Sequence, residues 1–365
     1  MLTQKPKSLV SVLTFVCLSL LTSMLIMEGV FLFLLNHPKI ANLNPVVFGY
    51  TRYLYEGFDK QHIQISSCAQ YHPDLFYTLK PGDCEFNERE FKSHYHINSM
   101  GLRDDEESLK APEIIAVGDS FTMGWGVDQN ETFASILEQK TGLKTLNAGI
   151  ASYGTVREMI LLSKLDLSHL KYLILQYCPN DCSENFELRG NGKLSISSRE
   201  DYESDREMHR KTHRYYPGRY SIEALKIWAE TNPLAWLNQK LHPSEDSQIM
   251  GEPYTPKPND GGPEDCARLV IQTLDRFIKK LPALEKVHII FLNLKLDHTL
   301  TPLFTDWVSE AAKDPSNPPV LKNLKVVHSS EFLRKWLHYY TLDDHMNAKG
   351  HQAIAEALLN VMNQN

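Results

Sequence analysis

The sequence has no internal repeat, no low-complexity tract and no long run of one charge sign. These absences exclude architectures built from repeats and exclude polyionic tails. An excess of basic residues is also missing, because 38 Lys and Arg side chains stand against 45 Asp and Glu, for a formal net charge of -7. Nucleic-acid-binding domains usually carry a basic surface, so we expect no nucleic-acid partner.

Motifs for a metal, a redox centre or a cofactor are missing as well. No Cys-x-x-Cys occurs, since three residues separate Cys178 from Cys182, and the His and acidic residues lack the spacing of familiar metal sites. We therefore expect no cofactor and no metal. The Gly-x-Ser-x-Gly elbow of the α/β-hydrolases is also absent around Ser120.

Six cysteines are present, and five remain once Cys17 is assigned to an apolar N-terminal segment. An odd number leaves at least one thiol free unless a bond forms between chains. Spacing alone does not fix the connectivity. The pairing that we expect is Cys68 with Cys84 and Cys182 with Cys266, with Cys178 left as a buried thiol.

One long apolar run is present, over residues 8–35, with Lys5 and Lys7 before it. It is long enough to cross a hydrocarbon core of about 30 Å. A cleaved signal peptide would have an apolar region of about 7–15 residues and a small-x-small cleavage site, and neither is evident. We predict a single-pass anchor in the cytoplasmic (inner) membrane, with residues 1–7 inside and the remainder on the periplasmic or extracytoplasmic side. Glu28 interrupts the run near its outer end, where an interfacial position is favoured over a functional intramembrane carboxylate.

The remaining chain divides by composition, and its length suggests about two structural units. Residues 36–110 are polar, aromatic and turn-rich, and we interpret them as a membrane-proximal stalk or collar. From Ala111 strands alternate with helices, which predicts a parallel sheet covered on both faces. The predicted strands are Ile114–Val117, Thr145–Ala148, Tyr172–Tyr177, Val287–Asn293 and Leu324–His328. The predicted helices are Glu131–Lys140, Thr155–Leu165, Pro263–Leu281 and one that begins near Asn347.

The alternation stops over residues 183–262, which are charge-dense and contain one predicted helix, Ile222–Glu230. The stretch is too long for a plain connection in a compact domain. We predict that residues 111–182 and 263–365 form one domain, interrupted by an insertion that serves as a lid or a substrate platform. Its Arg and Tyr side chains could receive an anionic or sugar-rich substrate, but interleaved acidic residues are more typical of a solvated surface.

A candidate nucleophile follows the first predicted strand of this domain. The apolar run Ile114–Val117 breaks at Gly118 and delivers Asp119 and Ser120 to its carboxyl end. Ligands of open parallel sheets bind just beyond the carboxyl ends of the strands. Asp and Ser are also common in turns for local hydrogen-bonding reasons, so this segment alone does not establish catalysis.

A serine nucleophile needs a base that is oriented by a third group, and the chain offers one before its last helix. In Asp343-Asp344-His345 a loop can fold Asp343 back onto one ring nitrogen of His345, which leaves the other nitrogen for Ser120. Asp344 stays possible as the orienting acid. His351 is a rival base, but it falls inside the helix, where packing or hydrogen bonding is the more common role.

Acyl chemistry also needs donors aimed at the developing oxyanion. Gly149 follows the second predicted strand and could present its backbone N–H without obstruction by a side chain. Asn180 follows the third strand and carries a carboxamide donor. Each alone is as typical of a turn, but three successive strand ends that present Ser, Gly and Asn, with Asp-x-His near the C-terminus, form a specific set.

This set resembles the SGNH (GDSL-like) hydrolase family, whose four blocks carry Ser, Gly, Asn and His. Gly118-Asp119-Ser120 matches the first block, Gly149 the second, Asn180-Asp181 the third and Asp343-x-His345 the last. The resemblance implies a flavodoxin-like three-layer α/β/α fold with a five-stranded, mainly parallel sheet. It also implies an oxyanion hole of the Ser120 and Gly149 amides and the Asn180 side chain. The third block departs from Gly-x-Asn-Asp, because Cys178 replaces the glycine and Pro179 follows.

The resemblance and the predicted anchor together lead us to expect a serine-dependent carboxylic-ester hydrolase or O-acyltransferase. The expected substrate is an O-acylated cell-envelope glycan, with acetyl as the expected acyl group. One alternative is a lipase or lysophospholipase that acts on lipid esters near the membrane. Another is a non-catalytic glycan-binding or assembly protein that keeps the fold. The sequence does not decide whether water or a sugar hydroxyl accepts the acyl group.

Overall fold

Five apolar segments form the central sheet, in the spatial order β6-β5-β7-β8-β9 with every neighbouring pair parallel. All five strand predictions are confirmed to within two residues at either end. β5, β6 and most of β7 and β8 are buried along their length, as is typical of parallel strands that are covered on both faces. The strands are Ile114–Gly118 (β5), Thr145–Gly149 (β6), Tyr172–Tyr177 (β7), His288–Asn293 (β8) and Lys325–Val327 (β9).

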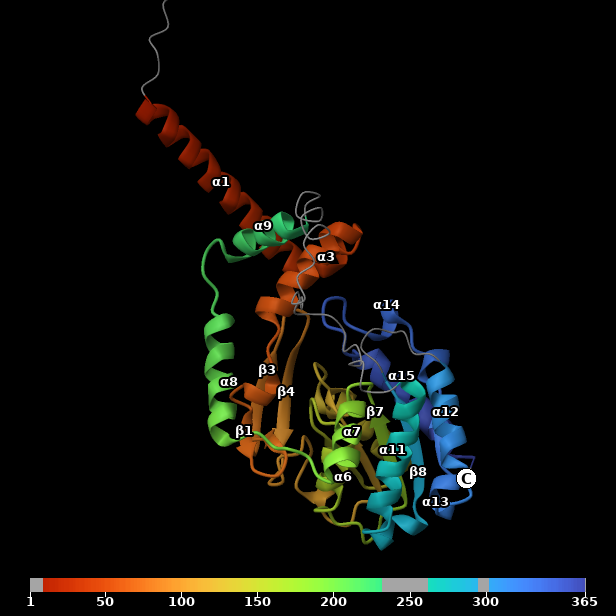
Figure 1. The fold of residues 1–365 in the computed structure, drawn as a ribbon. Helices are drawn as coiled ribbons and strands as arrows, with labels where there is room; N and C mark the ends of the chain where they lie inside the picture. The colour runs from red at the N-terminus through yellow and green to blue at the C-terminus, as the bar shows by residue number, and fades with distance from the viewer. Residues whose placement is uncertain (1–8, 232–261, 295–301, 365) are drawn as a thin grey trace, which may run out of the picture. The chain divides into compact units, whose positions relative to one another are not determined.

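The computed structural model describes residues 9–231, 262–294 and 302–364 (Figure 1). The predicted stub 1–7 and part of the predicted insertion lie outside these residues. The chain divides into two units. The sheet unit comprises Gln61–His209 and Glu252–Asn365, and the helical unit comprises Met1–Lys60 and Arg210–Gly251.

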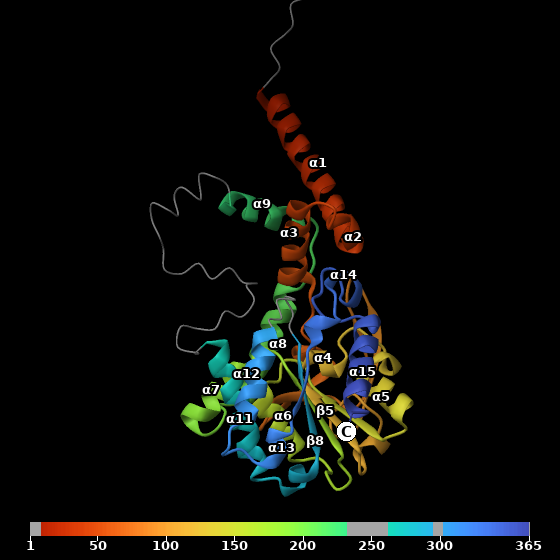
Figure 2. The same ribbon diagram turned by 90° about the vertical axis from the view of Figure 1, so that its right-hand side faces the viewer.

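Helices cover both faces of the sheet, which confirms the three-layer α/β/α fold (Figure 2). One face carries α5 (Phe133–Thr141) and α15 (Ala348–Met362), which pack on Ile114, Ala116 and the equivalent residues of β7 and β8. Side chains that alternate with these, such as Ile115 and Val117, face the other layer. That layer holds α6 (Thr155–Leu162), α7 (Asp181–Asn191), α11 (Pro263–Ile278), α12 (Pro302–Ala312) and α13 (Pro319–Lys322).

The chemistry of the helix ends explains why these helices begin and end where they do. Thr132 caps α5 by accepting the Ser135 N–H, and Gly142 ends it in the left-handed conformation. Asn347 caps α15, as predicted, because its side chain accepts the N–H groups of Lys349 and Gly350. The apolar stripe of α15 then packs against the sheet, with Ile354 and Leu358 fully buried.

Two antiparallel pairs of strands precede the central sheet and belong to the same unit. β1 (Ala69–His72) pairs with β2 (Phe76–Leu79), and β3 (Gly82–Asn87) pairs with β4 (Lys92–Ile97). Their inward side chains, including Tyr77 and Tyr95, join the core of the central sheet. From Gln61 onward, the segment that we interpreted as a stalk or collar is therefore part of the sheet unit.

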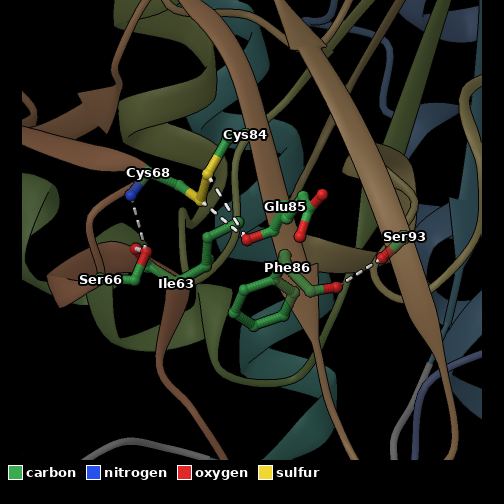
Figure 3. Close-up of a disulfide and its surroundings, with 7 residues drawn as sticks. All are labelled: Ile63, Ser66, Cys68, Cys84, Glu85, Phe86 and Ser93. Carbon is green, nitrogen blue, oxygen red and sulfur yellow. Dashed lines mark hydrogen bonds between the residues drawn. A yellow bond between two sulfur atoms is a disulfide. The ribbon is translucent and has the colours of Figure 1, made fainter.

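Two disulfides are present, and both expected pairings are confirmed. Cys68–Cys84 joins the segment before β1 to β3 (Figure 3). Next to this disulfide, Ser66 Oγ accepts the Cys68 N–H, and Ser93 Oγ on β4 donates to the Phe86 carbonyl on β3. Cys182–Cys266 joins α7 to α11 on one face of the sheet. The Cys178 thiol is free and buried, as expected.

The helical unit contains α1 (Leu9–Asn36), α2 (Pro38–Ala41), α3 (Pro45–Leu54), a π-helical turn over Tyr55–Asp59, and α9 (Arg219–Thr231). α1 is long and apolar enough to cross a membrane. α9 includes the one helix predicted in the insertion. Two further helices of that stretch, α7 and α8 (Arg199–Thr212), were not predicted; α7 and the part of α8 up to His209 belong to the sheet unit. The remaining short helices are α4 (Ser120–Met123) and α14 (Lys335–His338).

Candidate active site

Ser120 begins the short helix α4, directly beyond the carboxyl end of β5. Asp119 caps α4 by accepting the Phe121 N–H at 2.9 Å, and Gln176 on β7 accepts the Asp119 N–H at 2.9 Å. The turn requires glycine at position 118, because an added Cβ would lie 2.2 Å from Thr122 Oγ1 and 2.4 Å from Gln176 Oε1. The strand end therefore fixes the position of Ser120 through backbone geometry.

Ser120, His345 and Asp343 form one hydrogen-bonded series. His345 Nε2 lies 2.7 Å from Ser120 Oγ, and His345 Nδ1 bonds to Asp343 Oδ1. The Asp343 carboxylate also accepts the His345 backbone N–H at 3.0 Å, so the loop before α15 does fold back on itself. Asp343 is fully buried, whereas Ser120 and His345 keep 8% and 6% of their surface exposed. A nucleophile, a base and an orienting acid need this arrangement.

Trp125 packs against this series from the segment that follows α4. Its indole Nε1–H donates to Asp343 Oδ2 at 3.1 Å. Its ring stacks on the His345 imidazole, with 4.6 Å between centroids and 14° between planes. Trp125 therefore restricts both the carboxylate and the ring, and nothing in its sequence context had indicated this.

Glu90 holds the loop that carries Asp343. Its carboxylate accepts the backbone N–H groups of Thr341 at 2.8 Å, Leu342 at 2.6 Å and Asp343 at 3.0 Å. Glu90 lies in the turn between β3 and β4, about 250 residues away along the chain. Burial raises the pKa of this carboxyl, while the three N–H donors oppose the shift. No pattern in the sequence indicated this contact.

The alternatives left open for the base and the acid separate clearly in space. The Asp343 carboxylate bonds to the His345 ring. The rival base His351 is buried within α15, stacks on Phe133 and accepts the Phe133 N–H at its Nδ1. Burial lowers the pKa of His351 to about 3, so its ring is neutral and serves packing.

The two predicted oxyanion donors follow the strands on either side of β5. Gly118 pairs in register with Gly149 on β6, and Asn180 begins α7 after β7. The Gly149 N–H donates to Asn147 Oδ1 at 3.1 Å, so it is engaged in this structure. No residue with a Cβ fits at position 149, because that atom would lie 2.3 Å from the Met123 backbone nitrogen.

Asn180 lines a surface cavity of about 380 Å³. Two of its other lining residues, Phe76 and Ser152, have left-handed backbone angles (φ of 71° and 61°), which non-glycine residues rarely adopt. Strained residues of this kind cluster at functional sites. Arg157 also lines the cavity, paired with Glu184 at 2.5 Å. The lining also includes Ser183, Ser195, Ser197 and Glu187.

Buried acidic groups lie near Ser120 in the core of the sheet unit. Burial raises the pKa of Asp119 to about 6, although the Cys178 thiol, which stands where the family has glycine, bonds to its carboxylate. Burial and the neighbouring acids raise the pKa values of Glu158 and Asp181 further. Neither oxygen of Glu158 has a hydrogen-bond partner among the described atoms. This part of the core therefore favours protonated carboxyls.

No protein-family model and no curated protein matches the chain. Among solved structures it is similar to a lipolytic protein of the G-D-S-L family from Veillonella parvula DSM 2008, at 14% identity and a TM-score of 0.36, over 69% of this chain and 98% of that one. It is also similar to a lipolytic protein of the G-D-S-L family from Desulfitobacterium hafniense DCB-2. The sequence identity is 13% and the TM-score is 0.35, over 68% of this chain and 98% of that one. A third similar structure is that of a carbohydrate esterase, at 13% identity and a TM-score of 0.37, over 70% of this chain and 69% of that one.

Proposed function

We propose that this protein is a serine-dependent carboxylic-ester hydrolase of the SGNH type. The observation that carries the proposal is the contact of Ser120 Oγ with His345 Nε2 at 2.7 Å, with Asp343 on the other ring nitrogen. A serine in this environment has a base in place to remove its proton. Ser120 and His345 are 225 residues apart along the chain, so local turn chemistry does not account for their meeting.

The reaction proceeds in two steps. Ser120 Oγ attacks the ester carbonyl while His345 Nε2 takes its proton, and Asp343 stabilises the resulting imidazolium. The tetrahedral intermediate collapses, the C–O bond to the alcohol breaks, and His345 returns the proton to the leaving alkoxide. An acceptor hydroxyl then attacks the acyl-serine with the same proton transfers in reverse. Water as acceptor gives hydrolysis, and a sugar hydroxyl gives O-acyl transfer.

The oxyanion is stabilised by the Ser120 and Gly149 amides and the Asn180 carboxamide. The bond from Gly149 N–H to Asn147 Oδ1 means that the oxyanion shares this donor or replaces the Asn147 oxygen on it. The side-by-side order of β6, β5 and β7 supports this set, because it brings the three strand ends together.

O-acylated, and specifically acetylated, envelope glycans are the proposed substrates. The cavity beside Asn180 supports this choice, because hydroxyl, carboxamide and charged side chains line most of it, together with the apolar Phe76, Leu194 and Ile196. Sugars present many hydroxyl groups that such a lining can hydrogen-bond. The apolar helix α1 supports a single-pass anchor in the cytoplasmic membrane, with the sheet unit on the periplasmic side.

Replacing Ser120 tests the proposal. We expect Ser120→Ala to lower kcat for a chromogenic acetate ester by about a thousandfold or more. The exposed Ser163, which bonds only to a nearby carbonyl, is the matched control as Ser163→Ala. A fluorophosphonate probe should label the native chain and the control but not Ser120→Ala. Equal hydrolysis and labelling of all three would remove Ser120 from its role, and no labelling of the native chain would favour a non-catalytic binding protein.

A panel of esters then separates the substrate classes. Acetate esters should react faster than long-chain esters, and adding glycan acceptors should reveal any transfer. A clear preference for long acyl chains would instead favour a lipase acting near the membrane surface.

A further inference from the structure

The only charged residue of α1, Glu28, is buried against the N-terminus of α9. Glu28 Oε2 accepts the Ser221 N–H at 2.9 Å and lies 3.0 Å from Ser221 Oγ, and Glu28 Oε1 accepts the Tyr215 hydroxyl at 3.0 Å. Ser221 Oγ also lies 2.9 Å from the Met24 carbonyl. A carboxylate is stabilised at this end of a helix by the unsatisfied N–H groups and the helix dipole. Glu28 therefore ties α9 to one level of α1.

Glu28 lies at the end of an apolar segment of α1 that is about as long as a bilayer core is thick. Leu9 to Glu28 spans about 30 Å of helix, which equals the thickness of a hydrocarbon core. Apolar side chains before Glu28 are exposed all along the segment. Beyond it, Leu34 and Leu35 are buried within the helical unit. The exposed residues of the segment are Val10, Val12, Leu13, Phe15, Val16, Leu18, Leu20, Leu21, Leu25 and Ile26.

α9 presents an apolar face that continues from its contact with α1. Leu225 and Trp228 follow Ser221 at spacings of four and three, so the three side chains lie on one side of the helix. Leu225 is 46% exposed and Trp228 is 60% exposed. The opposite side carries Glu223 and Lys226, which form an ion pair at 2.9 Å. Figures 1 and 2 show α9 lying across the end of α1 and beside α3.

We propose that α9 is an interfacial helix, with Leu225 and Trp228 inserted at the boundary between lipid headgroups and acyl chains. The proposal rests on the anchor proposed above and is independent of the hydrolase activity. A lipid surface is the occupant favoured by continuity, because Leu225 and Trp228, exposed among the described residues, continue the side of α9 on which Ser221 contacts the spanning helix. Its chemistry also fits, since Trp and Tyr are enriched at membrane interfaces, and the exposed Tyr215 and Tyr216 precede the helix.

The same level of the helical unit carries more exposed apolar surface. The exposed residues are Ile40 on α2, Leu43 on the turn after it, and Val46 on α3. Both helices contact α1. Two amphipathic segments on the spanning helix would set its depth better than the helix alone. Glu28 has a positioning role in this arrangement, because it fixes where α9 joins α1.

Spin labels on the full chain in phosphatidylethanolamine–phosphatidylglycerol vesicles test the proposal. Single labels are placed at W228C, L225C and K226C in a C17S background, since Cys178 is buried and the other cysteines are paired. Collision with oxygen reports lipid exposure, and collision with a water-soluble nickel chelate reports aqueous exposure. We expect the oxygen-to-nickel ratio at 228 and 225 to exceed that at 226 by several-fold. K226C is the matched control, because it lies on the opposite side of the same helix.

Labelling the native Cys17, which is exposed on α1, separates failure of the anchor from failure of the proposal. In one outcome, the label at position 17 reports lipid while the labels at 228 and 225 collide with the nickel chelate as often as the label at 226 does. In that case the anchor stands and the placement of α9 is wrong. If 17 is also open to nickel, the anchor and the proposal both fall. If 228 and 225 are shielded from both reagents, protein covers this face, and the lipid assignment is wrong. Unchanged thermal midpoints show that the variants are folded.

Discussion

The geometry at Ser120 depends on a few residues that never touch it. Asp343 orients His345, and Asp343 is held in turn by Trp125 and by the loop on which it sits. Glu90 fixes that loop with three hydrogen bonds from consecutive backbone N–H groups. Hydrogen bonds to a charged group contribute about 1.5–3 kcal/mol each, so the position of Asp343 is strongly determined. Glu90 is a positioning residue, because it acts only through the loop.

Replacing Glu90 with glutamine should therefore lower kcat more than it changes KM. Glutamine offers one acceptor oxygen where the carboxylate offers two, and its amide N–H groups face N–H donors. We expect kcat for an acetate ester to fall by about tenfold to a hundredfold, from the loss of about 1.5–3 kcal/mol. The pH dependence of kcat/KM should also shift, because the carboxylate that orients His345 moves. Steady-state kinetics across the pH range measures both effects.

Glu85→Gln is the control, since Glu85 is exposed on the neighbouring strand. A purely structural role for Glu90 would lower the thermal midpoint and leave the pH profile of the folded enzyme unchanged. That result would contradict the positioning role.

At the scale of elements, strands and helices could be predicted from the sequence wherever their residues are buried without interruption. β5 to β8 were predicted because parallel strands covered on both faces are apolar along most of their length. β4 was missed, although its inward residues Ser93, Tyr95 and Ile97 alternate with exposed ones. α8 was missed because Tyr202 is its only fully buried side chain, so its surface is almost wholly polar. Glu90 could not be predicted, because its partners lie about 250 residues away.

The two disulfides should differ in what they contribute to stability. Cys182–Cys266 closes a separation of 84 residues, and Cys68–Cys84 closes one of 16. The entropy of the unfolded chain gives about 4–5 kcal/mol for the first and about 3 kcal/mol for the second. We expect the double serine variant at 182 and 266 to be the less stable of the two double variants. Urea unfolding measures the difference, and the reverse order would show that closing the chain is not the main effect.

At the scale of the whole molecule, the sheet unit buries several ionisable groups, and burial disfavours their charged forms. Burial raises the pKa values of Asp104 and Asp119 to about 6, and it raises those of Glu158 and Asp181 as well. A carboxyl with a raised pKa in the folded protein stabilises it fully below its unfolded pKa of about 4. This stabilisation is lost as the pH rises through the folded pKa. His351 acts in the opposite sense, with a contribution that is lost only as the pH falls below about 6.5.

The contribution of the raised carboxyls to the free energy of unfolding should therefore fall as the pH rises, through about pH 6 for Asp104 and Asp119 and at higher pH for Glu158 and Asp181. For Asp119 alone, a pKa difference of about 2 corresponds to about 3 kcal/mol, which is lost mainly between about pH 4 and pH 6. Glu158→Gln is neutral at every pH and should make this slope shallower, whatever it does to stability at one pH. Glu85→Gln, on an exposed carboxyl, should leave the slope as it is. Urea unfolding at several pH values gives the slopes. Equal slopes for the native chain and Glu158→Gln would mean that Glu158 is already charged in the fold, and the account of a protonated acidic core near Ser120 would have to be given up.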